Sequence, residues 1–245
     1  MISKAQIKLI QSLKQIKFRR EHRLFVAEGK KIVEELIRSD IRVREVYATL
    51  EWMEENKALT DEFGTEVFRI NQKELERISK LNTPNQVLAV CRIPERKPEE
   101  IKGEKIQLAL DSIRDPGNLG TIIRTADWFG IQEVICSDDC VDVYNPKVVQ
   151  ASMGSIARVK MYYTDLAEYL SGCGKNIYAT VLDGESIFTS AAEEGVFVIG
   201  NESKGIRQEV LQQATHLISI PSHGGAESLN ASVATGIILA YARKL

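Results

Sequence analysis

The sequence has few residues that bind metals or form disulfides, with 4 cysteines and 3 histidines among 245 residues. No two cysteines stand in a CxxC pair, so the spacing argues against a metal site and favours buried, reduced cysteines in a cytosolic protein. No apolar run is long enough to span a bilayer, and the first residues lack the apolar core of a secretory signal. We therefore expect a cytoplasmic protein without a membrane partner. The residues in question are Cys91, Cys136, Cys140, Cys173, His22, His216 and His223.

Familiar nucleotide-binding and hydrolase motifs are also missing. The chain has neither GxGxxG after the first strand of its second half nor GxxxxGK[ST]. The sequence therefore argues against an ordinary dinucleotide-binding protein and against a P-loop protein. The stretch Gly172-Cys173-Gly174-Lys175 resembles part of a P-loop, but it joins a helix pattern to a strand pattern and is interpreted as a turn. No nucleophile elbow of a Ser-His-Asp hydrolase is present.

Charge is unevenly distributed, although the net charge is only −2. Between residues 4 and 31, nine lysines and arginines are opposed only by Glu21 and Glu28. Such a basic segment is suited to contact phosphate groups. It is equally typical of a solvated helix face, so charge alone leaves both interpretations open.

Helix and strand patterns alternate through the first part of the chain. An apolar stripe predicts a helix over 3–15, capped by Ser3, with Ile7, Ile10, Leu13 and Ile16 inward. Strands are expected over 24–27, 42–48, 66–70 and 87–93, and helices over 30–38, 51–59 and 72–81. These elements predict a small α/β domain over residues 1–95.

A charged, proline-containing stretch, 94–100, has no apolar periodicity and marks a domain boundary. We assign residues 96–104 to a linker and 105–245 to a second domain. In that domain, strands and helices alternate, which predicts a parallel sheet with crossover helices. Strands are expected over 106–113, 133–137, 177–182, 197–200 and 217–221, and helices over 119–129, 145–153, 165–170 and 228–243.

The last of these helices has almost no polar face. Ser228 provides a hydroxyl suited to cap its N-terminus. A helix that is apolar on most sides is buried, and we expect this one to pack against the sheet and a second subunit. Its apolar residues are Leu229, Val233, Ile237, Ile238, Leu239 and Tyr241.

Three clusters in the second domain combine small and polar residues. In the first, 118–126, Gly120 and Arg124 are four apart on one helix face, with Asn118 at the helix start. A guanidinium beside an amide and open backbone suits a phosphate or ribose oxygen. The second cluster is 199–205, and the third is 220–221 followed by 228–230. Each alone is typical of a helix cap or strand end, but parallel strands bring such ends to one sheet edge, where ligands bind.

The order and spacing of the clusters resemble the SpoU (TrmH) family of RNA ribose 2′-O-methyltransferases. The similarity covers 108–245 and includes the stretches Asn145-Pro146-Lys147-Val148-Val149 and Met153-Gly154-Ser155. The first domain, with Phe25-Val26-Ala27-Glu28-Gly29 and 81–86, is similar to that family's L30-like substrate-binding domain. The resemblance implies an α/β-knot (SPOUT) domain in which the chain threads a loop, against the general rule for connections.

The resemblance also implies bound S-adenosylmethionine and a homodimer built with the last helix. Matching motif positions make Thr180, Leu182, Gly200, Ile220 and Leu229 the expected cofactor contacts, mostly through backbone groups. A cofactor pressed on backbone would leave no room for a side chain at position 200. The family's polar motif positions correspond to Asn118, Arg124, Glu202, Ser228 and Asn230.

In the implied reaction, a ribose hydroxyl loses its proton while its oxygen attacks the sulfonium methyl group. The family's proposed base corresponds to Arg124. Since guanidinium groups stay protonated in proteins, we favour Arg124 as a clamp for the nucleotide's phosphate, with that phosphate or Ser228 assisting proton removal. Glu202 is interpreted as holding the motif or a dimer contact rather than as an acid or base.

The expected substrate is structured RNA, because the first domain resembles an L30-like domain, and 23S rRNA is favoured over tRNA. A catalytically silent RNA-binding or ribosome-assembly protein with the same fold is the alternative of another class.

Overall fold

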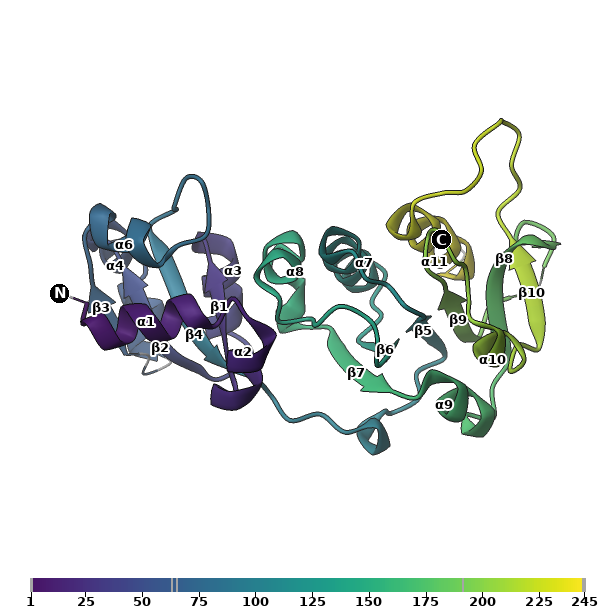
Figure 1. Cartoon of the computed structure of the whole chain (residues 1–245), viewed down its shortest axis with the longest axis horizontal. Coiled ribbons are helices and arrows are strands. Elements are labelled where there is room, and N and C mark those ends of the chain that lie inside the picture. The colour runs from purple at the N-terminus through teal and green to yellow at the C-terminus, as the bar shows by residue number, and fades with distance from the viewer. Residues whose placement is uncertain (1, 63, 65, 191, 244–245) are drawn as a thin grey trace. The chain divides into compact units, whose positions relative to one another are not determined.

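The computed structural model of the chain (Figure 1) describes residues 2–62, 64, 66–190 and 192–243. It contains two compact units, and each is built from two stretches of sequence. Unit 1 comprises 1–95 with Asp142–Ala157, and unit 2 comprises Arg96–Val141 with 158–245. The sequence pattern, in contrast, counts 142–157 with the second domain. Within the described ranges, no helix combines the length and apolar composition that crossing a membrane requires.

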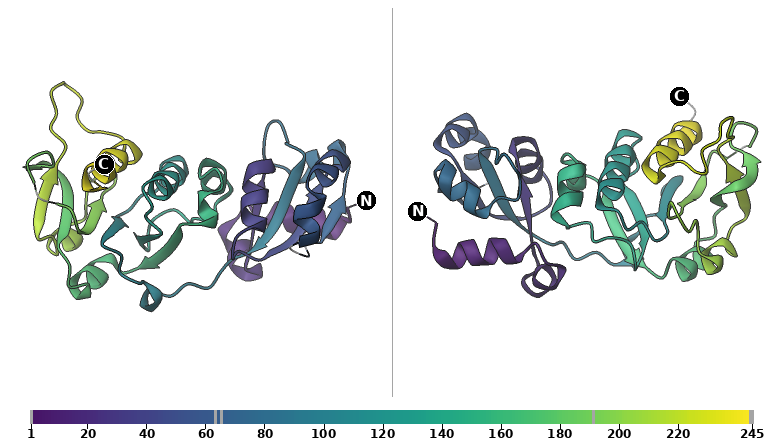
Figure 2. Two further views of the ribbon diagram at one scale, coloured as in Figure 1. Left: turned by 180° about the vertical axis from the view of Figure 1, so that it is seen from behind. Right: turned by 45° about the horizontal axis from the view of Figure 1, so that its top comes forward.

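Unit 1 is a four-stranded sheet covered by helices on both faces. The strand order is β1-β4-β2-β3, with β4 antiparallel to both neighbours and β2 parallel to β3. Helices α1 and α6 pack on one face through a common apolar core, and α3 contacts β1 and β4. Figure 1 shows α1 in front of the sheet, and Figure 2 shows the unit from behind. The bounds are β1 Leu24–Glu28, β2 Val43–Ala48, β3 Val67–Arg69, β4 Val87–Arg92, α1 Lys4–Ser12, α2 Ile16–His22, α3 Lys30–Ile37, α4 Leu50–Glu55, α5 Lys57–Glu62, α6 Gln72–Ile78 and α8 Pro146–Ala151.

The N-terminal helix is shorter than predicted. Ser3 caps α1 and forms a reciprocal capping box with Gln6, but the helix ends at Ser12 and α2 begins at Ile16. Ile16 is 42% exposed, so its predicted inward position was wrong. Between the two helices, the buried Arg19 guanidinium donates to the carbonyls of Leu13 and Lys14 at 2.9 and 2.7 Å and so holds the turn after α1.

The segment Asp142–Ala157 joins unit 1 through buried contacts. The Arg19 guanidinium donates to Asp142 Oδ2 at 2.6 and 2.8 Å, and the rings of Phe25 and Tyr144 lie 4.6 Å apart. Helix α8 packs on β1. Residues from the second half of the sequence therefore complete the core of the first unit.

Unit 2 is a six-stranded, all-parallel sheet of order β10-β8-β9-β5-β6-β7, as the α/β prediction required. Strand β7 and helix α10 were not predicted, because β7 is an edge strand without clear alternation and α10 has only four residues. Helix α11 packs on α7 and β9. The bounds are β5 Ile106–Leu110, β6 Glu133–Ser137, β7 Lys160–Thr164, β8 Ile177–Ser186, β9 Gly195–Ile199, β10 His216–Ser219, α7 Pro116–Trp128, α9 Leu166–Gly172, α10 Gln208–Leu211 and α11 Ala231–Arg243. That the chain threads a loop remains a prediction of the family resemblance.

The helices at the carboxyl edge begin at other residues than predicted. Helix α7 starts at Pro116, and Asp115 caps it by accepting from Asn118 N. Helix α11 starts at Ala231, where Asn230 Oδ1 accepts from the first backbone N–H groups. The predicted cap Ser228 lies before the helix, so that assignment was wrong. An Asn amide is as good a cap as a Ser hydroxyl, and sequence alone does not choose between them.

Helix α11 is buried on one face only. Thr235, Ile238, Leu239 and Ala242 are buried, whereas Val233 is 51% exposed. The predicted burial is therefore confirmed for one stripe, and outside it Val233 is exposed while Ile237 and Tyr241 are half-buried.

Candidate functional site

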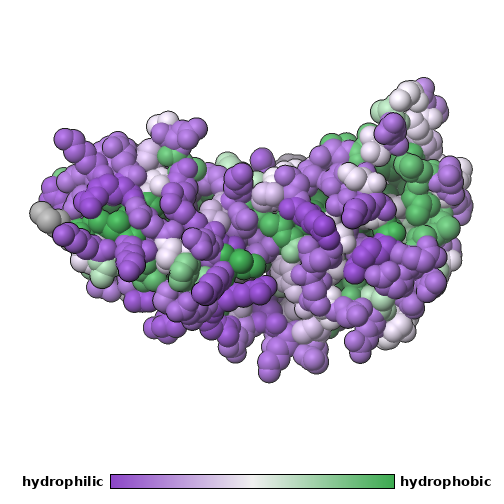
Figure 3. Space-filling model, viewed as in Figure 1, coloured by the Kyte–Doolittle hydropathy of each residue, from purple (hydrophilic) through white to green (hydrophobic). Residues whose placement is uncertain are grey.

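A cavity of about 620 Å³ opens at the carboxyl edge of the unit 2 sheet. Three loops, after the first part of β8, after β9 and after β10, form its walls. Figure 3 shows apolar surface gathered over β8 and β10, below the projecting loop that leads to α11. All five residues predicted to bind a cofactor line this cavity: Thr180, Leu182, Gly200, Ile220 and Leu229.

The first wall is a stretch of β8 that leaves the pairing with β10. Strand β10 pairs with Tyr178 and Ala179, and its next residues pair with Glu185 and Ser186, so 180–184 leave the ladder. A Cβ on Gly184 would lie 2.6 Å from the backbone of Ile218, so this stretch closes only with glycine there. It carries Leu182, which is 74% exposed at the cavity. Large exposed apolar side chains at a cavity rim are typical of a ligand site.

The second wall is the loop from Gly200 to Arg207. Asn201 folds it, because its Oδ1 accepts from the backbone N–H of Ser203 and Lys204 at 3.0 and 3.2 Å. Its Nδ2 donates to the Ser112 carbonyl at 2.9 Å and fastens the loop to the end of β5. A Cβ on Gly200 would lie 2.5 Å from the backbone of the loop's own return, at Gly205. Glycine is therefore needed at position 200 because the loop closes on itself there. A different reason, the close approach of the cofactor, was expected from the sequence.

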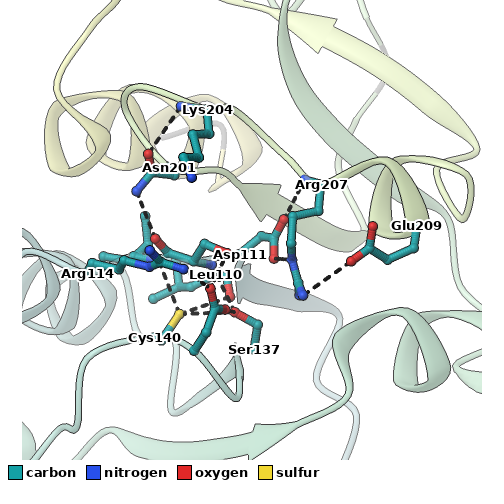
Figure 4. Close-up of polar contacts among 12 residues, drawn as sticks. Leu110, Asp111, Arg114, Ser137, Cys140, Asn201, Lys204, Arg207 and Glu209 are labelled. Carbon is teal, nitrogen blue, oxygen red and sulfur yellow. Dashed lines mark hydrogen bonds and ion pairs between the residues drawn. The ribbon is translucent and has the colours of Figure 1, made fainter.

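A buried ion pair fixes the far end of this loop (Figure 4). Asp111, fully buried at the end of β5, accepts from Arg207 backbone N–H and from Arg207 Nε, both at 2.7 Å. The Arg207 side chain is 40% exposed and also pairs with Glu209 at 3.3 Å. Neither partner was singled out from the sequence. The available signal was a carboxylate directly after an apolar strand, but nothing in the sequence identifies its partner 96 residues later.

A second polar network holds the segment between β5 and α7. Ser137 Oγ accepts from Ser112 N at 2.9 Å and donates to Asp139 Oδ1 at 2.7 Å. Asp139 Oδ2 accepts from Ser112 Oγ and from Arg114, both at 2.8 Å. Partial burial acts to raise the pKa of Asp139, but the hydrogen bonds from Arg114, Ser137 and Ser112 outweigh it and lower that pKa to about 2. Ser112, with φ of 59°, turns the chain toward α7 inside this network.

The three sequence clusters meet in one chain of hydrogen bonds. Asn230 Oδ1 accepts from Ser232 N and Val233 N, so its Nδ2 points away from α11 and donates to Asn118 Oδ1 at 2.8 Å. Asn118 Nδ2 then donates to Glu202 Oε1. The backbone N–H groups at the start of α11 thus fix the orientation of the Asn230 amide and, through it, of the Asn118 amide. Glu202 is the last acceptor in this series of hydrogen bonds.

Ser228 and Arg124 stand apart from this chain of hydrogen bonds. Ser228 lines the cavity and is exposed. Arg124 is exposed on α7 and makes no hydrogen bond or ion pair with any residue that the structure describes. Gly120 is buried, so the open backbone patch expected beside Arg124 is absent from this face of α7. The structure brings together Asn118, Glu202 and Asn230, with Ser228 in the same cavity lining as Glu202, and leaves Arg124 free to contact a phosphate.

Fold and site together define a class: a parallel α/β domain with a ligand-sized cavity among the loops at its carboxyl edge, preceded by a smaller α/β domain. Residues 105–240 match the SpoU rRNA methylase family, and residues 4–89 match the MRM3-like substrate-binding domain. The chain belongs to the SpoU family of RNA 2′-O-methyltransferases, which use S-adenosylmethionine.

Individual relatives agree with this assignment. The chain is 30% identical over 225 residues to the 23S rRNA (guanosine(2553)-2′-O)-methyltransferase RlmP of Bacillus subtilis, covering 89% of this chain and 88% of that protein. A TrmH-family structure from Porphyromonas gingivalis has a TM-score of 0.90 at 35% identity, over 100% of this chain and 99% of that one. An AdoMet-bound rRNA methyltransferase from Sinorhizobium meliloti has a TM-score of 0.89 at 31% identity, over 100% and 97%.

The cavity suits the family's cofactor. Its volume of about 620 Å³ lies within the ~300–1,000 Å³ usual for ligand pockets. Apolar side chains, including Leu217 and Leu229, offer a surface for the adenine ring, and the carboxylates of Asp183 and Glu202 lie in the lining of a site for a cationic ligand. Two of the walls contain the second and third sequence clusters, and the β8 wall contains Thr180 and Leu182, which the family resemblance implied; the first cluster does not line the cavity.

Proposed function

We propose that this protein transfers the methyl group of S-adenosylmethionine to a ribose 2′-hydroxyl of 23S rRNA in the cytoplasm. The observation that carries the proposal is the single cavity in which all five expected cofactor contacts line the same walls as Glu202 and Ser228. The rRNA substrate is supported by the similarity to RlmP over most of both chains.

In this proposal the cofactor, when bound, supplies an electrophilic methyl group, and the protein aligns the hydroxyl that attacks it. Thr180, Leu182, Gly200, Ile220 and Leu229 hold the cofactor. The hydroxyl of Thr180 already donates to the Val198 carbonyl at 2.7 Å, so it fixes the loop and leaves backbone groups to face the ligand.

Arg124 clamps the phosphate of the target nucleotide. Its exposure and its lack of a partner among the described residues leave its planar guanidinium available for bidentate binding. Ser228, exposed in the cavity lining, helps to align the hydroxyl and remove its proton. A pH–rate profile of Arg124→Lys tests this role: full activity of the lysine variant at high pH would favour a basic side chain over the clamp.

Glu202, Asn118 and Asn230 position the site. Because the amide directions are set from α11, Glu202 has to accept a hydrogen bond, which a protonated acid would do less well. We therefore assign Glu202 to orient Asn118 and to join the second cluster to the first, and not to transfer protons.

We further propose that residues 1–95 form the substrate-binding domain, 96–104 the linker and 105–245 the methyltransferase domain, whose segment 142–157 packs within unit 1. We also propose that two chains associate through α11. Val233, exposed on α11, and Trp128, 83% exposed on the adjacent α7, support this interface. Light scattering coupled to size exclusion is expected to give a dimer for the natural chain and a monomer for Val233→Glu. A monomeric natural chain would refute the association.

The reaction itself is tested by transfer of labelled methyl from S-adenosylmethionine to separate, under-modified 23S, 16S and tRNA fractions, followed by digestion to nucleosides. Label recovered as a 2′-O-methylnucleoside from the 23S fraction is the expected result. Label confined to the tRNA fraction would contradict the rRNA substrate, and label on a base would contradict the ribose assignment. RNA binding without any cofactor binding would favour a silent RNA-binding protein.

A further inference from the structure

A second cavity, of about 360 Å³, lies in unit 1 against α8. Its apolar lining includes Val149, which is buried, and Leu81 and Pro146, which are half-buried. Such a volume is at the small end of the ~300–1,000 Å³ range for ligand pockets. A cavity of this volume has room for one nucleobase and is too small for a duplex.

Three lysines from three separate elements surround this cavity, which we call the lysine pocket. Lys14 follows α1, Lys80 follows α6, and Lys147 lies in the first turn of α8. All three are exposed, and none has a hydrogen bond or ion pair through its side chain to the described residues. Two other basic side chains near the N-terminus are held in ion pairs, Arg19 with Asp142 and Lys30 with Glu55.

One carboxylate also belongs to the lining, and it is held by the protein. Glu28 accepts from Ser79 Oγ and from the backbone N–H of Lys80 at 3.0 and 3.2 Å. Burial raises its pKa, while hydrogen bonds, chiefly the one from Ser79, and the positive charge of Lys14 act in the opposite direction. The charges around the pocket therefore sum to an excess of positive charge, with three ammonium groups against one carboxylate.

The lining offers hydrogen-bonding groups as well as charge. Asn145 Oδ1 accepts from Lys147 N at 3.0 Å, so the amide's orientation is set and its Nδ2 donors face away from that backbone. An apolar floor, fixed amide donors and flanking ammonium groups together match the parts of a nucleotide: a base with polar edges and phosphates on either side.

We propose that the lysine pocket holds one unstacked nucleotide of the RNA substrate, with its base on Leu81, Pro146 and Val149 and its flanking phosphates on Lys14, Lys80 and Lys147. The proposal rests on the proposed function for the identity of the ligand as RNA. It adds that recognition involves a single-stranded or bulged position, which a duplex does not present. This nucleotide is bound by unit 1.

The test measures binding of a fluorescein-labelled, single-stranded 12-nucleotide RNA of mixed sequence to the full chain by anisotropy, between 50 and 200 mM salt. The variant is Lys14→Gln/Lys80→Gln/Lys147→Gln. Each phosphate contact in a single strand contributes ~0.7 to the slope of log K against log salt, so loss of three contacts reduces the slope by about 2. The matched control is Lys8→Gln/Lys57→Gln/Lys73→Gln, which removes the same charge from exposed sites of unit 1 outside the pocket.

An unchanged slope in the pocket variant, or an equal change in the control, overturns the proposal. The base contact is tested with a 12-nucleotide strand whose bases are absent. The natural chain is expected to prefer the RNA over the abasic strand, and Leu81→Ser to lose that preference; no preference in the natural chain also overturns the proposal. Because this assay needs neither cofactor nor methyl transfer, a failed methylation assay with an intact lysine-dependent slope would refute the proposed activity and leave the pocket standing.

Discussion

Replacing Arg207 by Gln removes one side of a buried ion pair and leaves Asp111 charged. Removing one partner of a buried pair typically costs about 3–5 kcal/mol, because the remaining charge is uncompensated. Here Asp111 keeps the hydrogen bond from the Arg207 backbone N–H, and the lost side chain is 40% exposed. We therefore expect a loss near the lower end, about 3 kcal/mol in the free energy of unfolding.

The double variant Asp111→Asn/Arg207→Gln also removes the unpaired charge of Asp111. It is therefore expected to be more stable than Arg207→Gln alone. The assay is urea denaturation, with cofactor affinity measured by calorimetry where each variant is folded. Since Arg207 ends the loop that lines the cavity, the single variant is expected to bind S-adenosylmethionine more weakly.

The control is Lys105→Gln, which breaks an exposed pair with Glu194 and is expected to leave stability nearly unchanged, because exposed ion pairs contribute little. The reasoning is refuted if Arg207→Gln is as stable as the control, or if the double variant is less stable than Arg207→Gln.

Three further predictions concern the hydrogen bonds of Glu202, the hydrogen bonds of Asp139 and the loop that begins at Gly200. Glu202→Gln keeps an acceptor for Asn118, so it is expected to retain most of the methyl-transfer rate while Glu202→Ala loses at least about tenfold, roughly the 1.4 kcal/mol of one hydrogen bond; equal losses in steady-state assays would indicate proton transfer by Glu202. The pKa of Asp139 is lowered in the folded chain to about 2 from an ordinary 3.8, so its contribution to stability is present above about pH 4 and is lost as the pH falls toward 2. Denaturation at pH 6 and pH 3 should therefore show a smaller acid-induced loss for Asp139→Asn than for the natural chain, and equal losses would refute this. Gly200→Ala forces a Cβ to within 2.5 Å of backbone and is expected to cost about 1–3 kcal/mol in a thermal melt, whereas Gly224→Ala, with open space around its Cβ, should melt like the natural chain.

Local patterns predicted most of the secondary structure. The central strands β5 and β9 of unit 2 are mostly apolar and fully buried, and β6 was predicted with its observed bounds. Helix α3 buries the four residues expected, Ile32, Val33, Leu36 and Ile37. Errors occurred where two residues could serve the same local purpose, as with Ser228 and Asn230 at the start of α11. Strand β7 was missed because its burial comes from its neighbours and not from its own alternation.

The residues of the candidate site were predicted from the order of the motifs. The contacts that hold its loops in place were not. The cavity contains the predicted cofactor contacts because strand ends of a parallel sheet meet at one edge. The pair of Asp111 and Arg207 joins positions 96 residues apart, and the closure of Gly200 on Gly205 depends on backbone geometry. Neither has a signature in local propensity or periodicity, so only the folded chain reveals them.

The chain passes between the two units three times, at 95/96, 141/142 and 157/158. Neither unit is therefore a module that a single cut can release. Residues 1–95 expressed alone would expose Phe25, which packs on Tyr144, and would leave Arg19 buried without Asp142. A hybrid enzyme that takes its N-terminal domain from a relative must take 142–157 from that relative as well. Strand β1 then keeps its own α8 packed against it.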